Sequence, residues 1–232
     1  MEKSAGSECS GLSEPAADCV FPALYHGPVY YFARLLRQEE IILEQYENYG
    51  KQSYRNRCLI MGPNAPVSLS IPVSRPHGVK TLFRDIRIHY EGRWNRIHWR
   101  SLQAAYASSP YFELMADEWA PFYEQHFDFL LDYNRRLLEI TLSTLGASIP
   151  VRFSDKFTPI RSKQDPRYFI HPKKDIRSFD PDFRPGFYQQ VFSDRLGFLP
   201  NLSILDLLFN LGSEARAYLQ ESLKTKSGKA RT

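Results

Sequence analysis

The stretch VFPALYHGPVYYFARLL at residues 20–36, followed by IILE at 41–44, decides how the folded body begins. Residues 20–25 are apolar and aromatic, which is typical of a strand. The HisGlyPro turn at 26–28 places a proline where it fits the start of a helix, and it predicts a short helix over 29–36. The apolar run at 41–44 predicts a second strand. The chain therefore opens with a strand–helix–strand unit.

A β-hairpin is predicted next. Two apolar segments, 54–61 and 67–73, flank GPNAP at 62–66, and this link has the composition of a turn. The second segment alternates aliphatic residues with serines, so its side chains divide between two faces. Residues 82–89 alternate in the same way and predict a further strand, with Asp85 on its polar face.

The pattern then changes to helical spacing. Residues 94–108 carry an apolar stripe that includes His98, and residues 117–145 keep a spacing of three and four up to Gly146, a typical helix stop. Strands first and helices second predict an α+β fold, in which an N-terminal mixed β-sheet packs against a helical C-terminal half.

The remaining segments are less regular. A short strand is expected over 151–157, followed by a proline- and charge-rich loop over 158–186 that is either functional or partly mobile. The closing segment, 188–212, is apolar, and Asn201 or Ser203 is expected to cap a helix in it.

Composition and length favour a single domain. The chain has 232 residues, of which 1–19 are predicted to be a disordered leader, 20–224 one folded domain and 225–232 a basic disordered tail. Lys and Arg total 30 against 26 Asp and Glu, a net charge of +4 that comes partly from the tail. Nucleic-acid binders concentrate basic charge on one face, so we expect no nucleic-acid partner.

The cysteines, the apolar runs and the missing motifs argue against several classes of protein. Cys9, Cys19 and Cys58 are too few and too irregular for a disulfide framework or a zinc site, so no metal site is expected. No apolar run is long enough to cross a membrane and no signal-peptide pattern is present, which favours a cytoplasmic protein without a membrane span. GxGxxG, Walker A, HExxH and GxSxG motifs are absent, so the sequence leaves the cofactor unknown.

The polar segment EQYENYGKQSYRNR at 44–57 is the clearest candidate for ligand binding, because it interrupts two apolar runs. In an extended segment Arg55 and Arg57 would share a face and could clamp one carboxylate, phosphate or diphosphate. The structural alternative is that both arginines lie on a solvated strand face and pair with Glu44, Glu47 or Asp85.

Two histidines are the catalytic candidates. His98 is a candidate general base because imidazole titrates near neutrality, although its apolar stripe equally suits a buried histidine with one hydrogen bond. His26 lies in a turn just before a predicted helix, a position that suits an anion site or a base over a cleft. The alternative for His26 is an ordinary loop histidine.

The predicted substrate-binding residues are polar or aromatic. Amide and hydroxyl groups suit sugar hydroxyls, although they also cap turns. Aromatic rings can stack on a sugar, although they are more often part of a core. Asp85 could orient a histidine or pair with an arginine. The predicted set is Tyr25, Gln45, Asn48, Ser53, Arg55, Asn56, Arg57, Asp85 and Trp94.

Four strings of sequence together resemble the WbqC-like protein family over roughly residues 20–212. They are ALYHGPVYYFARL, EEIILEQYENYGKQSYRNRCLIMGPNAPVSLSIPV, FRDIRIHYEGRWNRIHWRSLQAAYASSPYF and VFSDRLGFLPNLSILDLLFNLG. Members commonly open with a tyrosine–leucine–proline turn, where this chain has Tyr25, His26, Gly27 and Pro28.

The resemblance implies a role in bacterial O-antigen or capsule biosynthesis. The implied activity is transfer of a glycyl-like or other acyl group to a sugar. Its partners would be a sugar nucleotide or polysaccharide precursor and an acyl donor. Two other classes stay open: a non-catalytic protein that binds or assembles glycan precursors, and a structural protein.

Overall fold

The computed structural model describes residues 19–74 and 79–223, and the structural statements below concern these residues. Except for Cys19, which is buried, the predicted leader lies outside the described residues, as does the predicted tail at 225–232.

The strand–helix–strand opening is confirmed. Strand β1 (Val20–Phe21), helix α1 (Val29–Leu35) and strand β2 (Ile41–Leu43) follow in order, and β1 and β2 pair in parallel. Strand β7 (Val151–Phe153) pairs in parallel with the other edge of β2, which gives the order β1-β2-β7. The strand predicted over 20–25 ends at Phe21, because Pro22 has no N–H to donate to a ladder.

The hairpin is also confirmed. Strands β3 (Arg57–Met61) and β4 (Pro66–Ser70) pair antiparallel, with Arg57 opposite Ser70 and Met61 opposite Pro66. The first strand begins later than predicted because residues 51–56 form turns.

The other predicted strands are shorter than expected. Pro72 separates β4 from strand β5 (Val73–Ser74), which pairs with β6 (Arg87–Ile88). Half of the strand predicted over 82–89 is instead a 3-10 helix, η1 (Phe83–Asp85), and an extended residue before β6. In the described residues the strands thus form three small sheets rather than one mixed sheet.

Helix α2 (Trp94–Tyr106) occurs as predicted, but the single helix expected over 117–145 is wrong. The chain forms α3 (Phe112–Trp119), α4 (Pro121–Glu124) and α5 (Leu130–Thr144). Pro121 opens a new helix because it lacks the N–H that would continue the preceding one, and extended residues from Gln125 end α4. Gly146, at φ +65°, follows the end of α5 as expected.

The C-terminal part is helical. The segment 158–186 contains α6 (Pro166–Phe169) and η2 (Ile176–Ser178), and it is followed by α7 (Ser193–Leu196), α8 (Ile204–Leu211), η3 (Gly212–Glu214) and α9 (Ala215–Ser222). Ser203 caps α8, since its hydroxyl accepts a hydrogen bond from the Leu205 N–H at 3.3 Å. Asn201 instead accepts from the Tyr30 N–H at the start of α1.

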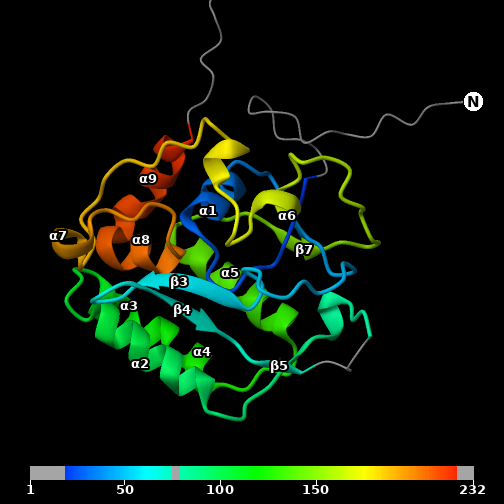
Figure 1. Cartoon of the computed structure of the whole chain (residues 1–232), viewed down its shortest axis with the longest axis horizontal. Coiled ribbons are helices and arrows are strands. Elements are labelled where there is room, and N and C mark those ends of the chain that lie inside the picture. The colour runs from blue at the N-terminus through cyan, green and yellow to red at the C-terminus, as the bar shows by residue number, and fades with distance from the viewer. Residues whose placement is uncertain (1–18, 75–78, 224–232) are drawn as a thin grey trace, which may run out of the picture.

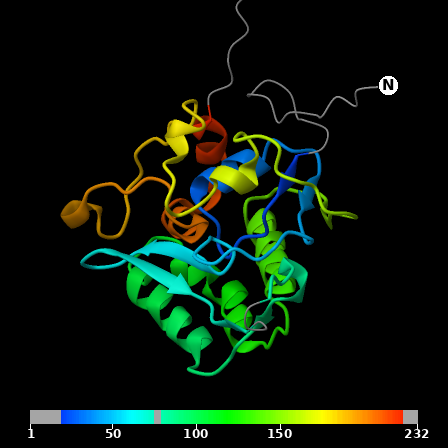
Figure 2. The same cartoon turned by 45° about the vertical axis from the view of Figure 1, so that its right-hand side comes forward.

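The hairpin β3–β4 lies between two groups of helices. Helices α1, α8 and α9 lie on one side of it and α2, α3 and α4 on the other, as Figures 1 and 2 show from two directions. The α+β class, with small sheets in the N-terminal half and a helical C-terminal half, is confirmed. Within residues 19–74 and 79–223, no helix is long and apolar enough to cross a membrane.

Candidate functional site

One hydrogen-bonded chain of four buried side chains joins the turn after β1 to helices α2 and α4. Its members are, in order, His26, Tyr123, Tyr25 and His98. His26 Nε2 lies 2.8 Å from the Tyr123 hydroxyl, and the Tyr25 hydroxyl lies 2.9 Å from His98 Nδ1. The two tyrosine hydroxyls hydrogen-bond to each other, and the backbone of Ser70 hydrogen-bonds to His98. We call these four residues the His–Tyr chain.

Local structure fixes the start of the His–Tyr chain. The Tyr25 N–H donates to the Tyr54 carbonyl at 2.9 Å, which ties the segment after β1 to the turn before β3. His26 has a φ of +42°, a conformation that costs a non-glycine residue of order 1–3 kcal/mol and is concentrated at functional sites. The Ser203 hydroxyl donates to the His26 carbonyl at 2.9 Å, so the cap of α8 also holds this turn.

The far members come from two helices. His98 lies on α2, one turn after Trp94, whose ring meets the imidazole edge-on at 5.1 Å between centroids. Tyr123 lies on α4, and Asn95 of α2 donates to its carbonyl at 2.7 Å. Tyr123 thus lies on a short helix of its own, which begins at Pro121, and its hydroxyl contacts His26 from there.

One arrangement of protons satisfies all the hydrogen bonds of the His–Tyr chain, and it is assigned from the acceptor beside His98. The Ser70 backbone contact raises the pKa of His98, as a carbonyl acceptor does, so Nε2 carries the proton and Nδ1 must accept from the Tyr25 hydroxyl. With the Tyr25 proton on this bond, the order that uses every neutral group once has the Tyr123 hydroxyl donating to Tyr25 and Nε2–H of His26 donating to Tyr123. His26 Nδ1 is left with a lone pair, and no described residue donates to it.

Burial keeps the His–Tyr chain uncharged. It lowers the pKa of His26 to about 3, with the nearby His98 adding to the effect. It also lowers the pKa of His98 to about 4, against the opposing effect of the Ser70 backbone. The pKa values of Tyr25 and Tyr123 are raised, again mainly by burial. At neutral pH all four groups are therefore neutral, because desolvation disfavours every charged form.

Stability is expected to fall as the pH is lowered from about 7 to about 5. Both histidines have a lower pKa folded than unfolded, so the unfolded state binds protons first, below the ordinary value of 6.5. Two such groups give a slope of at most roughly 2.7 kcal/mol per pH unit. Urea unfolding of the full chain at several pH values measures this. The double variant His26→Gln/His98→Gln should lose most of the slope, with a remainder from His171, whose pKa is also lowered by burial. A wild-type stability that stays level would contradict the burial of both imidazoles.

Further polar atoms around the His–Tyr chain lack partners. Trp119 packs against His26 at 5.5 Å between ring centroids, and Trp94 packs against Tyr133 at 6.0 Å. Within the described residues, Trp94 Nε1, Trp119 Nε1 and the Tyr133 hydroxyl have no hydrogen-bond partner, although all three side chains are buried. Buried polar groups are rarely left unpaired, so these donors are available to the oxygen atoms of a bound molecule.

The predicted arginine clamp is wrong in its geometry. Arg55 lies in a turn rather than a strand, and its guanidinium contacts Glu47 at 2.6 and 2.7 Å, with both side chains buried. The pairing with Glu47 in the structural alternative is therefore confirmed for Arg55, but the solvated strand face is wrong because Arg55 is buried in a turn. Arg57, at the start of β3, makes no ion pair with any described residue. Asp85 is exposed and lies 3.8 Å from Arg84, so it neither pairs with these arginines nor orients a histidine.

The predicted neutral polar residues mostly hold backbone. Ser53 donates to the Gly50 carbonyl at 2.9 Å, Asn56 to the Ile71 carbonyl at 2.9 Å and Gln45 to the Ser154 carbonyl at 2.7 Å. Asn48 is exposed. The structure thus brings together His26, Tyr25, His98 and Trp94 of the predicted site and leaves Asn48 and Asp85 at the surface.

Sequence reasoning missed Tyr123, Tyr133 and Trp119. All three come from the stretch of α3 to α5, where a continuous helix was predicted. The signal for a break was Pro121 inside the string DEWAPFYEQHF. No cluster of three metal-binding side chains occurs in the part of the chain that the structure describes.

These features define an α+β protein with a buried, uncharged His–Tyr chain at its centre. The protein belongs to the WbqC-like protein family, which matches residues 25–177. It is 31% identical over 219 residues to the uncharacterized protein Rv1507c of Mycobacterium tuberculosis, an alignment that covers 82% of this chain and 91% of that protein. No solved structure matches the chain.

Proposed function

We propose that the protein is a transferase of bacterial surface-polysaccharide biosynthesis that moves an acyl or aminoacyl group, such as glycyl, to a sugar or sugar nucleotide. Membership of the WbqC-like family supports this proposal. The observation that carries it is the buried, unpartnered Nδ1 of His26 at the end of the His–Tyr chain, to which the proton arrangement above assigns a lone pair. A neutral imidazole with a free lone pair is able to take a proton from an attacking amine or hydroxyl.

The proposed step is acyl transfer with proton removal by His26. The acceptor nitrogen or oxygen attacks the acyl carbon of the donor, its proton passes to His26 Nδ1, and the leaving group of the donor departs with a proton returned from the same site. As Nδ1 gains a proton, Nε2 can pass its own to Tyr123, and so on through Tyr25 to His98. The positive charge would then be shared with His98 rather than held at one desolvated ring.

Unpartnered donors next to His26 would hold the reacting group. The Trp119 ring packs against the imidazole, and its unpartnered indole N–H suits an oxygen of the donor or acceptor. His26 and Trp119 are only 2% and 1% exposed, so the proposed reaction requires the side chains around them to move when the substrate enters.

A second candidate is a protein that binds a glycan precursor without chemistry. The observation that favours it is the low pKa of both histidines, because a weakly basic imidazole is a weaker proton acceptor at neutral pH. In that case the unpartnered indole and phenol groups would serve only as hydrogen-bond donors to the sugar.

A transfer screen separates the two candidates. The purified full chain would be incubated with nucleotide-linked amino sugars and with acyl or glycyl thioesters, and the products analysed by mass spectrometry. We expect one acceptor to gain the mass of the acyl group. Tight binding of a sugar nucleotide with no modified sugar under any donor would contradict the transferase proposal and support the binding protein.

A further inference from the structure

Arg57 is an uncompensated cation at the edge of the hairpin. It makes no ion pair with a described residue, and its buried Nε atom has no hydrogen-bond partner. Arg55, two residues earlier, is neutralised by Glu47. A guanidinium left in this state retains its planar set of donors for a carboxylate or a phosphate.

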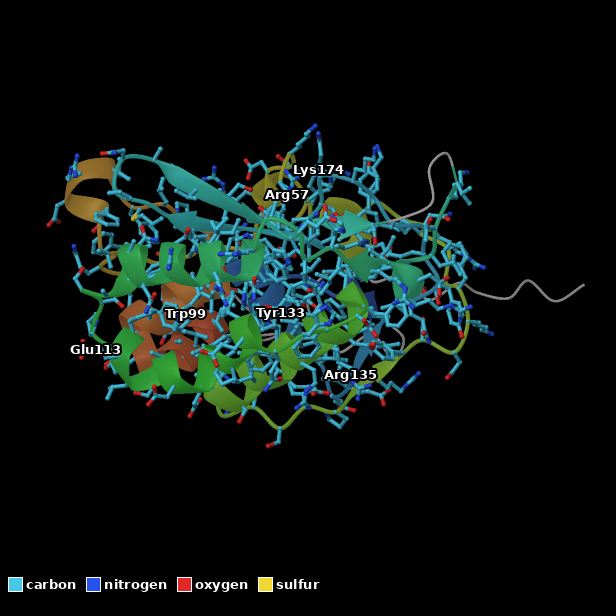
Figure 3. The ribbon with its side chains drawn as sticks, turned by 90° about the horizontal axis from the view of Figure 1, so that it is seen from below. Arg57, Trp99, Glu113, Tyr133, Arg135 and Lys174 are labelled. Carbon is cyan, nitrogen blue, oxygen red and sulfur yellow. The ribbon has the colours of Figure 1, made fainter. Side chains whose placement is uncertain are left out.

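Further cations come from the segment between α6 and η2. Burial lowers the pKa of His171, and the positive charges of Lys174, Arg55, Lys173 and Arg57 add to this effect, so these four cations lie near the imidazole. Figure 3 shows Arg57 and Lys174 next to each other, although they come from β3 and from the 158–186 segment. The long irregular segment therefore supplies half of a basic cluster whose other half is on the hairpin.

Lys174 is held in place without an acidic partner. Its Nζ atom lies 3.2 Å from the centre of the Tyr168 ring and donates to the Tyr168 carbonyl at 2.6 Å, which leaves further N–H groups free. The neighbouring Asp175 lies 3.4 Å from Arg177 and forms its ion pair there. In the described residues no carboxylate forms an ion pair with Arg57, Lys173 or Lys174.

The basic cluster adjoins the His–Tyr chain. Arg57 pairs in register with Ser70, and the backbone of Ser70 is the group that hydrogen-bonds to His98. The turn that carries Arg55 is also tied to the segment before Tyr25, since Asn134 donates to the carbonyls of both Arg55 and Ala23, at 2.7 and 3.1 Å.

We propose that Arg57, His171 and Lys174 bind a diphosphate group, with Lys173 adding to the field. Three positive charges without acidic partners, contributed by Arg57 and the two lysines, match a diphosphate better than a single carboxylate. Nε2 of His171 is the ring nitrogen left to contact the ligand, because Nδ1 accepts from the Lys173 N–H at 3.2 Å. The inference rests on the proposed function only for the source of the diphosphate, which is either a sugar nucleotide or a lipid carrier.

Isothermal titration with uridine diphosphate and with inorganic pyrophosphate tests the site directly. We expect the wild-type chain to bind, and Arg57→Gln and Lys174→Gln each to weaken binding by at least about tenfold, as expected for loss of a charge-assisted hydrogen bond. Arg100→Gln is the matched control, since Arg100 is an exposed arginine of α2 that forms no ion pair among the described residues. Circular dichroism checks that each variant is folded.

A second arm uses phosphatidylcholine vesicles with and without polyprenyl diphosphate. Preference for uridine diphosphate, or for the vesicles that carry polyprenyl diphosphate, would support the site and identify the source. No binding of any probe by the wild-type chain, or an equal loss in Arg100→Gln, would overturn the site. Binding without transfer would leave the site standing and contradict the proposed transferase. Transfer that is unaffected by Arg57→Gln and Lys174→Gln at limiting substrate would overturn the site and leave the transferase standing.

Discussion

Replacing His26 with glutamine is expected to lower the rate of acyl transfer by roughly 10²–10⁴-fold, the usual contribution of a positioned base. The glutamine amide N–H can take the place of Nε2–H and donate to Tyr123, so the packing and the hydrogen bond are retained. Glutamine provides no basic lone pair at the position of Nδ1. The proton of the acceptor would then have no route into the His–Tyr chain.

The measurement is the initial rate of product formation by mass spectrometry, for variants of equal thermal stability. His126→Gln serves as the control because His126 is exposed, and its rate should equal that of the wild type. A His26→Gln variant that folds and transfers at the wild-type rate would remove His26 from the chemistry.

The largest loss of stability is expected from Asp206→Ala. Asp206 is fully buried on α8 and accepts hydrogen bonds from the hydroxyls of Tyr106 at 3.0 Å and Tyr188 at 2.6 Å, and from the Gln190 amide at 2.7 Å. Burial raises the pKa of its carboxyl, against the opposing effect of these hydrogen bonds. Alanine would leave the buried hydroxyls of Tyr106 and Tyr188 without this acceptor, whereas the Gln190 amide keeps the Leu199 carbonyl at 3.0 Å. The expected cost is about 3–5 kcal/mol in the free energy of unfolding.

Chemical denaturation of the full chain measures this cost. Asp117→Ala is the matched control, because Asp117 is exposed on α3, and it should change the unfolding free energy by no more than about 0.5 kcal/mol. A loss for Asp206→Ala no larger than that of the control would show that the cluster of Asp206, Tyr106, Tyr188 and Gln190 does not hold α8 to the segment that follows η2.

Local sequence patterns correctly predicted the strand–helix–strand opening and the hairpin. The strand–helix–strand opening and the hairpin follow from turns whose chemistry is local, at 26–28 and 62–66. The prediction of one long helix over 117–145 was wrong. The apolar spacing continues across Pro121, but this proline lacks the N–H that would continue the helix and begins α4 instead. The pairing of β7 with β2 joins residues more than a hundred positions apart, and no local pattern indicates such a contact.

The site was predictable in its residue types but not in its connections. Chemistry alone pointed to His26 and His98, but the hydroxyl that links His26 to the others belongs to Tyr123, 97 residues further along the chain. Arg55 and Arg57 looked equivalent in the sequence. Only the turn over 51–56 decides that Arg55 meets Glu47 while Arg57 does not.

The transfer rate of Tyr25→Phe tests the central claim most directly, since this change removes one hydroxyl in the middle of the His–Tyr chain and leaves both histidines in place. Tyr31→Phe is the matched control. It also removes a buried hydroxyl, but this hydroxyl donates to the Pro22 carbonyl and is not part of the His–Tyr chain. The account predicts that Tyr25→Phe loses at least about tenfold in rate beyond any loss in Tyr31→Phe. Equal rates in the two variants would contradict a role for the His–Tyr chain in transfer.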